Sequence, residues 1–101
     1  MAQSTAKLVL TRAHGMIAQK ECWLQGAWKH PLEEGGFQRC AYQAVYDAAL
    51  ELGLPASGSF KLLMKALGDG RRSAIKGLPA FNDGASHKEV LKLFELAIED
   101  A

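Results

Sequence analysis

The sequence has few of the residues that build β-sheets. It contains 3 valines, 3 isoleucines and 2 threonines, against 16 alanines. Alanine and straight-chain residues lose little rotamer freedom in a helix, whereas sheets are enriched in β-branched side chains. The composition therefore predicts an all-α protein. A length of 101 residues predicts a single α-helical domain over residues 1–101, built around one hydrophobic core.

The sequence also lacks long apolar runs, a strong net charge and a set of cysteines. No segment approaches the ~20 apolar residues of a membrane span, and the N-terminal residues lack the apolar stretch of a signal peptide. We therefore expect a cytoplasmic protein, in which Cys22 and Cys40 are reduced thiols. The net charge of +1 predicts no long-range attraction to nucleic acid or membranes. No motif indicates a cofactor.

Apolar side chains recur at helical spacing over most of the chain. The predicted main helices run from Ser4 to Lys20, from Phe37 or Arg39 to Leu52, from Ser57 or Ser59 to Gly68, and from Ser86 through Ile98. A short extra helix of at most two turns is predicted within residues 69–79, ending at Gly77 and Pro79. Together these elements predict a compact bundle of four main helices plus one short helix.

Two local patterns refine this bundle. The second helix carries apolar residues on two faces, which is typical of a central helix packed on both sides. Residues 23–38 are the only part without a helical pattern, and turn-forming residues occupy positions 31–36. Residues 25–29 and 37–39 are therefore the expected strands of a possible small β-hairpin between the first two helices. Ser86 and Glu89 form a capping box at the start of the last helix.

Several short motifs resemble those of a family. They are "WLQGAW" at 23–28, "CAYQA" at 40–44 and "FNDGASHKEVLKLFELAI" at 81–98. They are similar to a family of small bacterial and phage-borne proteins catalogued as a domain of unknown function, with the pattern W-x-Q-G-A, C-A-L-G-A, W-N-D and E-V-L. Gln43 replaces the glycine of that pattern, and Phe81 replaces its last tryptophan. The resemblance covers the chain from about Met16 and implies a grouping without an activity.

The tryptophans suggest protein interaction. Trp23 and Trp28 are five residues apart and do not fit one helical stripe, so one is expected to pin the loop to the bundle and the other to face solvent. An exposed loop tryptophan is a suitable anchor for a protein partner. The predicted partner-binding residues are Trp23, Gln25, Trp28, Phe81, Asn82 and Asp83. A purely structural interpretation is open too: Gln25 would tie the loop, and "FNDG" would form the turn before the last helix.

A small cysteine hydrolase is one alternative. Cys40 lies near a predicted helix N-terminus, where the macrodipole lowers a thiol pKa. Gln25 would stabilise an oxyanion, and His87, beside Asn82 and Asp83, would act as the base. The competing interpretation is that Cys40 is a core residue, because cysteine is among the most buried residue types.

Nucleic-acid binding is the other alternative. The segment 61–76 holds five cations, namely Lys61, Lys65, Arg71, Arg72 and Lys76, against one acidic residue. It has no interleaved aromatic residues, and pairing with the acidic C-terminal helix is an equally open interpretation. A metal site built from Cys22, Cys40, His14, His30 and His87 is not favoured, because no closely spaced ligand pair is present. Homodimerisation remains possible if the two-sided helix leaves an apolar patch exposed.

Overall fold

The first helix shows how the chain begins its core. The computed structural model describes residues 4–68 and 73–101. Helix α1 spans Thr5–Ile17 and starts where predicted, because the Ser4 hydroxyl accepts a hydrogen bond from the Lys7 backbone N–H at 3.1 Å. Its inward residues, including Leu10 and Ile17, are fully buried. A short 3₁₀ turn, η1 (Lys20–Cys22), follows in place of the predicted last turn of the helix.

The connector contains the predicted β-hairpin, with a shifted first strand. Strand β1 (Lys29–Pro31) pairs antiparallel with β2 (Phe37–Arg39), and His30 lies opposite Gln38. The sequence predicts the first strand at 25–29, with Pro31 at the start of the turn, whereas the structure includes Pro31 in the strand. Proline is tolerated on a two-stranded ribbon, where its missing N–H faces away from the neighbour.

Helix α2 (Ala41–Leu52) is covered fully on one face and only in part on the other. Its alanine-rich face is buried against α1 and α4. On its second apolar face Tyr42 stacks on Phe60, but Tyr46 is 47% exposed and Leu50 is 66% exposed, so the predicted neighbour covers only part of it. The periodicity correctly identified the two faces, but it did not contain the information on how many helices would cover them. Gly53, in the left-handed conformation at φ 66°, ends the helix as expected.

The fourth helix differs most from the prediction. Helix α3 (Ser57–Leu67) ends at Gly68 as predicted, while α4 spans Ala74–Gly84 and continues through both Gly77 and Pro79. Pro79 removes one intrahelical hydrogen bond. The buried Gly77, Leu78 and Asn82 compensate through contacts of α4 with α2 and α3, so tertiary packing overrides the local stop signal. The "FNDG" segment is therefore the last turn of α4 and not a turn outside a helix.

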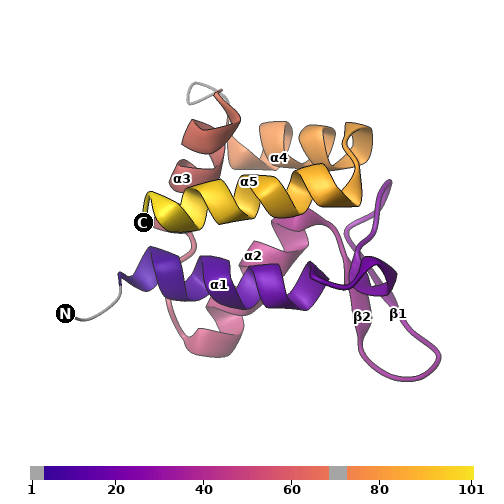
Figure 1. Cartoon of the computed structure of the whole chain (residues 1–101). Coiled ribbons are helices and arrows are strands. Elements are labelled where there is room, and N and C mark those ends of the chain that lie inside the picture. The colour runs from indigo at the N-terminus through magenta and orange to yellow at the C-terminus, as the bar shows by residue number, and fades with distance from the viewer. Residues whose placement is uncertain (1–3, 69–72) are drawn as a thin grey trace.

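The helices form two groups around the core. Figure 1 shows α1 and α5 (His87–Glu99) side by side and antiparallel, with α2 behind α1, with α3 and α4 on the far side of α5, and with the hairpin at one end. The predicted capping box at Ser86 is present in full. Helix accounts for 67% of the described residues, so the all-α prediction holds apart from the small sheet. No helix within residues 4–68 and 73–101 is both long and apolar enough to cross a membrane.

Candidate functional site

A buried amide joins the connector to two helices. Asn82, in the last turn of α4, is fully buried. Its Oδ1 accepts hydrogen bonds from the Trp23 indole Nε1–H at 2.7 Å and from the Ala41 backbone N–H at 3.0 Å. Its Nδ2 donates to the Leu24 carbonyl at 2.8 Å. Ala41 is the first residue of α2, where backbone N–H groups lack intrahelical partners, so one side chain fixes the loop and caps a helix.

Gln25 completes this arrangement at the end of α4. Its Nε2 donates to three backbone carbonyls, those of Asn82 at 3.0 Å, Asp83 at 3.2 Å and Ala85 at 2.8 Å. These carbonyls lie at the C-terminus of α4, where helical acceptors lack partners. The prediction that Gln25 ties the loop is confirmed by this geometry. Gly26, at φ 78°, donates its backbone N–H to the Asp83 carboxylate at 2.8 Å.

These five residues act as one structural unit, which we call the clasp: Trp23, Gln25, Gly26, Asn82 and Asp83. The first three belong to the "W-x-Q-G" motif and the last two to the "N-D" motif, which lie about 57 residues apart in the sequence. The chain order of the two motifs gave no sign that they bond to each other. The clasp accounts for the polar residue types of both motifs, because the Trp23 indole, the Gln25 amide and the Gly26 N–H each donate to an acceptor within residues 82–85.

Beside the clasp, His87 packs against Trp23 and connects α5 to α1. The Trp23 ring is half-buried and lies 5.3 Å from the His87 ring, at a tilt of 37°. The His87 Nε2 is 2.7 Å from the Ile17 carbonyl, which can only accept, so this nitrogen donates. His87 therefore links the beginning of α5 to the end of α1. Cys40 is not among its hydrogen-bond partners in the described residues.

Trp28 lies on the other side of the loop and faces solvent. Its side chain is 47% exposed, as the interaction hypothesis expects for one of the two indoles. Its ring meets Tyr42 edge-on at 5.3 Å, and Tyr42 stacks on Phe60 at 4.7 Å. The backbone is held in place as well, because the Trp28 carbonyl accepts from the Cys40 N–H at 2.9 Å. We call Trp28, Tyr42 and Phe60 the aromatic row; sequence analysis singled out only its first member.

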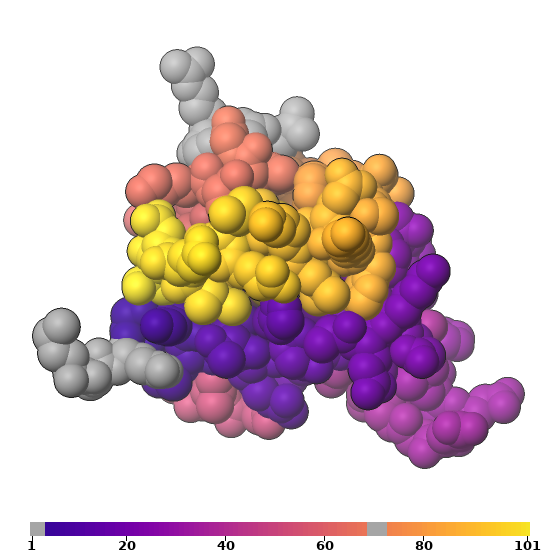
Figure 2. Space-filling view, in the orientation of Figure 1, coloured from indigo at the N-terminus to yellow at the C-terminus, as the bar shows by residue number. Residues whose placement is uncertain are grey.

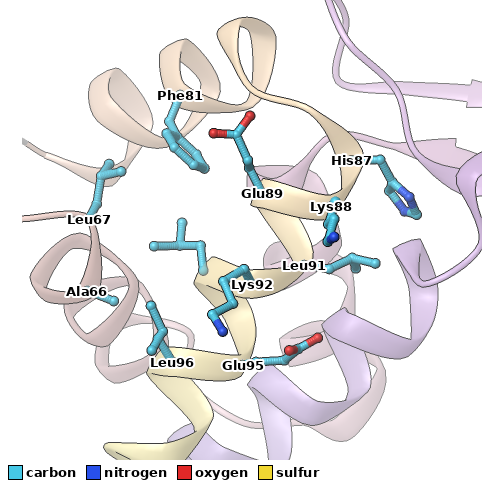
Figure 3. Close-up of a pocket in the computed structure, with 11 residues that line it drawn as sticks. Ala66, Leu67, Phe81, His87, Lys88, Glu89, Leu91, Lys92, Glu95 and Leu96 are labelled. Carbon is cyan, nitrogen blue, oxygen red and sulfur yellow. The ribbon is translucent and has the colours of Figure 1, made fainter.

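Phe81 lines a hollow that neither tryptophan lines. It lines a groove of about 800 Å³ between α5 and the ends of α3 and α4 (Figure 3). We call this hollow the α5 groove; its apolar lining consists of Ala66, Leu67, Phe81, Leu91, Leu93 and Leu96. The six predicted partner-binding residues therefore do not form one continuous patch. Four of them belong to the clasp, one to the aromatic row and one to the α5 groove.

Cys40 occupies the N-cap position of α2. Its Sγ accepts from the Gln43 backbone N–H at 3.4 Å, and the residue is 2% exposed. Burial raises the pKa of the Cys40 thiol above its usual range and outweighs the hydrogen bonds that favour the thiolate. The thiol also borders a small pocket of about 170 Å³, together with Trp28, Pro79 and Asp83. A neutral, enclosed thiol has little nucleophilic character at neutral pH.

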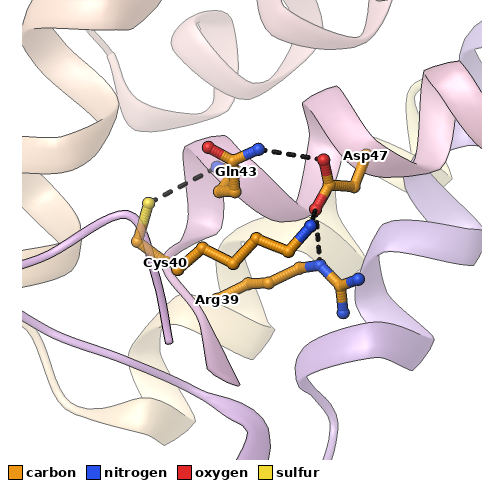
Figure 4. Close-up of polar contacts among 5 residues, drawn as sticks. Arg39, Cys40, Gln43 and Asp47 are labelled. Carbon is orange, nitrogen blue, oxygen red and sulfur yellow. Dashed lines mark hydrogen bonds and ion pairs between the residues drawn. The ribbon is translucent and has the colours of Figure 1, made fainter. Parts of the chain in front are cut away.

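An ionic cluster attaches the hairpin to α2. The Asp47 carboxylate accepts from Arg39 at 2.7 Å, from Lys29 at 2.9 Å and from Gln43 at 2.9 Å (Figure 4). Burial alone would raise the pKa of Asp47, but the hydrogen bonds from these three donors outweigh it and lower the pKa. The sequence alone does not predict this cluster. The two basic partners come from strands, whose pairing brings them to the helix.

The predicted basic segment is only partly described. Lys61 and Lys65 are exposed on α3, and Lys76 is exposed on α4. Lys65 pairs with Asp100 at 3.1 Å, which agrees with the predicted pairing between this segment and the acidic C-terminal helix. Arg71 and Arg72 lie outside the described residues.

The metal candidates are dispersed over the molecule. In residues 4–68 and 73–101, no group of three or more histidine, cysteine or acidic residues is arranged to hold a metal ion. Cys22 is half-buried and Cys40 is buried, and both are free thiols. His14 faces Glu95 at 3.2 Å, and His30 is exposed on β1.

The comparisons with known proteins place the chain in a family. A family model matches residues 1–100, and the chain belongs to this family of unknown function (DUF6197). No curated protein and no solved structure matches the chain. The family assignment carries no activity, so the function has to be argued from the geometry.

Proposed function

We propose that this protein is a non-enzymatic domain that binds a protein partner through the surface around Trp28. The observation that supports this most is that the Trp28 side chain is 47% exposed while its surroundings are ordered. Its carbonyl is bonded to Cys40, and its ring rests against Tyr42. A preordered indole loses little conformational entropy on binding, and tryptophan is enriched among residues that dominate interfaces.

The clasp supports this function indirectly. Trp23, Gln25, Asn82 and Asp83 use their polar groups on one another or on backbone groups, so their proposed part is to hold the loop that carries Trp28. The proposed contact with the partner is made by the aromatic row, above all by Trp28. Phe81 contributes no contact there, because its ring faces the α5 groove.

The neighbourhood of Trp28 favours an apolar partner surface over a nucleic acid. The Trp28 ring meets the Tyr42 ring edge-on, and Tyr42 stacks on Phe60, so the indole lies beside other aromatic rings. The two cations of the hairpin strands, Lys29 and Arg39, are already bonded to Asp47. A phosphate backbone needs unengaged lysines and arginines, whereas exposed aromatic rings suit apolar and aromatic side chains of another protein.

The two alternatives have weaker support. A hydrolase needs an accessible thiol with a depressed pKa, and Cys40 is 2% exposed with a raised pKa. We expect its alkylation at neutral pH to be much slower than that of free cysteine; an equal or faster rate would revive the hydrolase hypothesis. The nucleic-acid hypothesis relies on a segment in which Lys65 already pairs with Asp100. Binding to random duplex that weakens steeply with added salt would support it.

The motif resemblance adds a proposed biological setting. We propose a cytoplasmic accessory protein of bacterial or phage origin that modulates a host or self partner. The resemblance of the "W-x-Q-G-A" and "E-V-L" motifs to those of small bacterial and phage proteins supports it. Recovery of members only from eukaryotic genomes would contradict the origin.

The decisive experiment compares Trp28→Ala with Tyr46→Ala, because both wild-type side chains are 47% exposed. Each variant and the wild type would be immobilised and used to capture proteins from the native cytoplasm, followed by mass spectrometry. We expect a protein retained by the wild type and by Tyr46→Ala to be lost with Trp28→Ala. Identical capture by all three would contradict the proposal, as would a fall in Tm above ~5 °C for Trp28→Ala, since that corresponds to roughly 1 kcal/mol of core stability.

A further inference from the structure

The outward face of α5 carries an ordered pattern of charge. Its inward residues Val90, Leu93, Phe94 and Ala97 are buried, so helical geometry places positions 88, 92, 95 and 99 in the middle of the opposite face. These positions hold Lys88, Lys92, Glu95 and Glu99, and all four residues are exposed. Leu91 and Leu96 lie on the two flanks of this charged line. Figure 2 shows α5 on the near face of the molecule, between α1 on one side and α3 and α4 on the other.

The order of these charges is not explained by the stability of a single chain. The lysines occupy the N-terminal half of the helix and the glutamates the C-terminal half, which is the unfavourable order with respect to the helix macrodipole. Glu95 faces His14 at 3.2 Å. Among the residues that the structure describes, Lys88, Lys92 and Glu99 have no oppositely charged group within 4.0 Å.

The charge pattern of α5 is complementary to that of a second α5 that runs in the opposite direction. Positions 88 and 99, and likewise 92 and 95, are centred on one point, midway between Leu93 and Phe94. A two-fold axis through that point would lay a second α5 antiparallel to the first. Lys88 would then face Glu99 of the second copy, and Lys92 would face Glu95, with both pairs repeated by symmetry. Leu91 and Leu96 share the same centre, so each leucine would lie beside its own copy at the edge of the seam.

We propose that this face of α5 is a homodimer interface, in which a second copy of the chain packs antiparallel along the helix. The apolar contribution comes from the flanks: Leu96 is 44% exposed and stands at the edge of the α5 groove, next to Ala66 and Leu67 (Figure 3). Two acidic residues border the groove. Glu89 is bonded to the Ser86 N–H, and Glu95 contacts His14 through its Oε2 atom, so its other carboxylate oxygen can meet Lys92 of the second copy. Lys88 and Lys92 in turn face the acidic end of the second helix.

The size of the face sets the strength of the dimer. From position 88 to position 99 the helix rises ~17 Å, at ~1.5 Å per residue. Two helices in contact over this length bury less than the ~1,200 Å² of a standard stable interface. The dimer is therefore weak and forms at high protein concentration. Because its centre consists of exposed ion pairs, it weakens as salt is added. This interface uses none of the surface around Trp28, so the two proposals stand or fall separately.

A charge-swap experiment on the full chain tests the interface. One variant carries Lys88→Glu with Lys92→Glu, and the other carries Glu95→Lys with Glu99→Lys. Each has a like-charged line on α5 and is expected to be monomeric, whereas an equimolar mixture pairs an all-acidic line with an all-basic one and forms a heterodimer. A control for the first variant, Lys61→Glu with Lys76→Glu, makes the same change in net charge as Lys88→Glu with Lys92→Glu, on exposed sites away from this face. Sedimentation equilibrium measures the association, and thermal unfolding verifies that each variant is folded.

The outcomes separate cleanly. We expect the wild type and the control to dimerise at low salt, with about a tenfold or greater loss of affinity from ~50 to ~500 mM salt. We expect the mixture of the two charge variants to associate more tightly than the wild type. A wild type that stays monomeric at ~1 mM protein and low salt would overturn the proposal. A dimer that survives either charge reversal would overturn it equally, because that dimer would use another face.

Discussion

The two tryptophans of one loop are held by opposite kinds of chemistry. On the Trp23 side, a neutral buried amide satisfies the indole, a loop carbonyl and the first N–H of α2. On the Trp28 side, the indole is 47% exposed, and the hairpin beside it is attached to α2 because its two cations, Lys29 and Arg39, pair with the Asp47 carboxylate. The two halves of this motif therefore differ in role: the Trp23 half holds the loop to the helices, and the Trp28 half leaves an indole exposed.

The largest expected effect comes from removing the centre of the clasp. Asn82→Ala leaves the Trp23 N–H, the Ala41 N–H and the Leu24 carbonyl without their partner in a buried place. Each buried unsatisfied group costs ~1–3 kcal/mol, and partial access of water reduces the sum, so we expect a loss of ~3–4 kcal/mol in the free energy of unfolding. Urea denaturation measures this loss. A loss below ~1 kcal/mol would show that the clasp does not hold the loop.

The control for this change is Asp83→Asn, which keeps an oxygen acceptor for the Gly26 N–H at the exposed edge of the clasp. We expect it to alter the free energy of unfolding by only ~0.5 kcal/mol, as is common for exposed sites. Equal effects at positions 82 and 83 would contradict the distinction between the buried centre and its edge.

The second effect tests the ionic attachment of the hairpin. Asp47→Asn removes the negative charge that pairs with Arg39 and Lys29. Because hydrogen bonds to charged groups contribute ~1.5–3 kcal/mol, we expect the free energy of unfolding to fall by ~2 kcal/mol at pH 7. The folded-state pKa of Asp47 lies below its unfolded value of 3.8. Its contribution is therefore fully present above about pH 5 and is lost as the pH falls through the unfolded and then the folded pKa.

The measurement is the difference in unfolding free energy between the wild type and Asp47→Asn as a function of pH. This difference should stay constant from neutral pH down to about pH 5 and then shrink as Asp47 becomes protonated. For Asn82→Ala the corresponding difference should change little with pH, because the clasp's central side chain does not titrate. If the difference in unfolding free energy between the wild type and Asp47→Asn grew in acid, the pKa of Asp47 would be raised by folding and not lowered.

The sequence was sufficient for most of the helices and for little of the site. Ser4, Gly53 and the box at Ser86 mark helix ends by local chemistry, and the structure has helix ends at each of them. Pro79 is a helix-ending residue by the same local rules, yet α4 continues through it. The burial of Leu78 and Asn82 outweighs the one hydrogen bond that the proline removes. Local rules hold where the termini are exposed and fail where tertiary contacts dominate.

The clasp could be predicted only by residue type. Gln25 is a typical loop-tying residue, and its three carbonyl partners confirm that role. Nothing in the spacing of the two motifs indicated that the Trp23 indole would meet the Asn82 side chain and not a backbone carbonyl. The sequence pattern does not place Tyr42 or Phe60 beside Trp28. The structure does so, because Tyr42 of α2 stacks on Phe60 of α3 and meets the Trp28 ring edge-on. Pairings between distant segments require the fold.

The third effect is smaller and concerns the Trp23 indole N–H alone. Trp23→Phe keeps an aromatic ring against His87 but removes the donor to Asn82 at 2.7 Å. The Asn82 oxygen retains the Ala41 N–H, so it does not become fully unsatisfied. We expect a loss of ~1 kcal/mol, near the net value of one hydrogen bond, measured by urea denaturation. A loss as large as that for Asn82→Ala would mean that the ring's packing, and not its hydrogen bond, dominates.

The smallest effect distinguishes the two indoles without unfolding the protein. Each variant with one tryptophan reports on the other: Trp23→Phe leaves Trp28, and Trp28→Phe leaves Trp23. Trp28 is 47% exposed, whereas Trp23 is half-buried and bonded to a fully buried amide. Acrylamide should therefore quench the fluorescence of Trp28 more strongly, with an emission maximum at longer wavelength than that of Trp23.

Since Trp28→Phe keeps a ring beside Tyr42, its stability should change by less than ~0.5 kcal/mol. Equal quenching of the two indoles would remove the contrast between a fixed and an available half of the loop, and with it the main support for a binding role of Trp28.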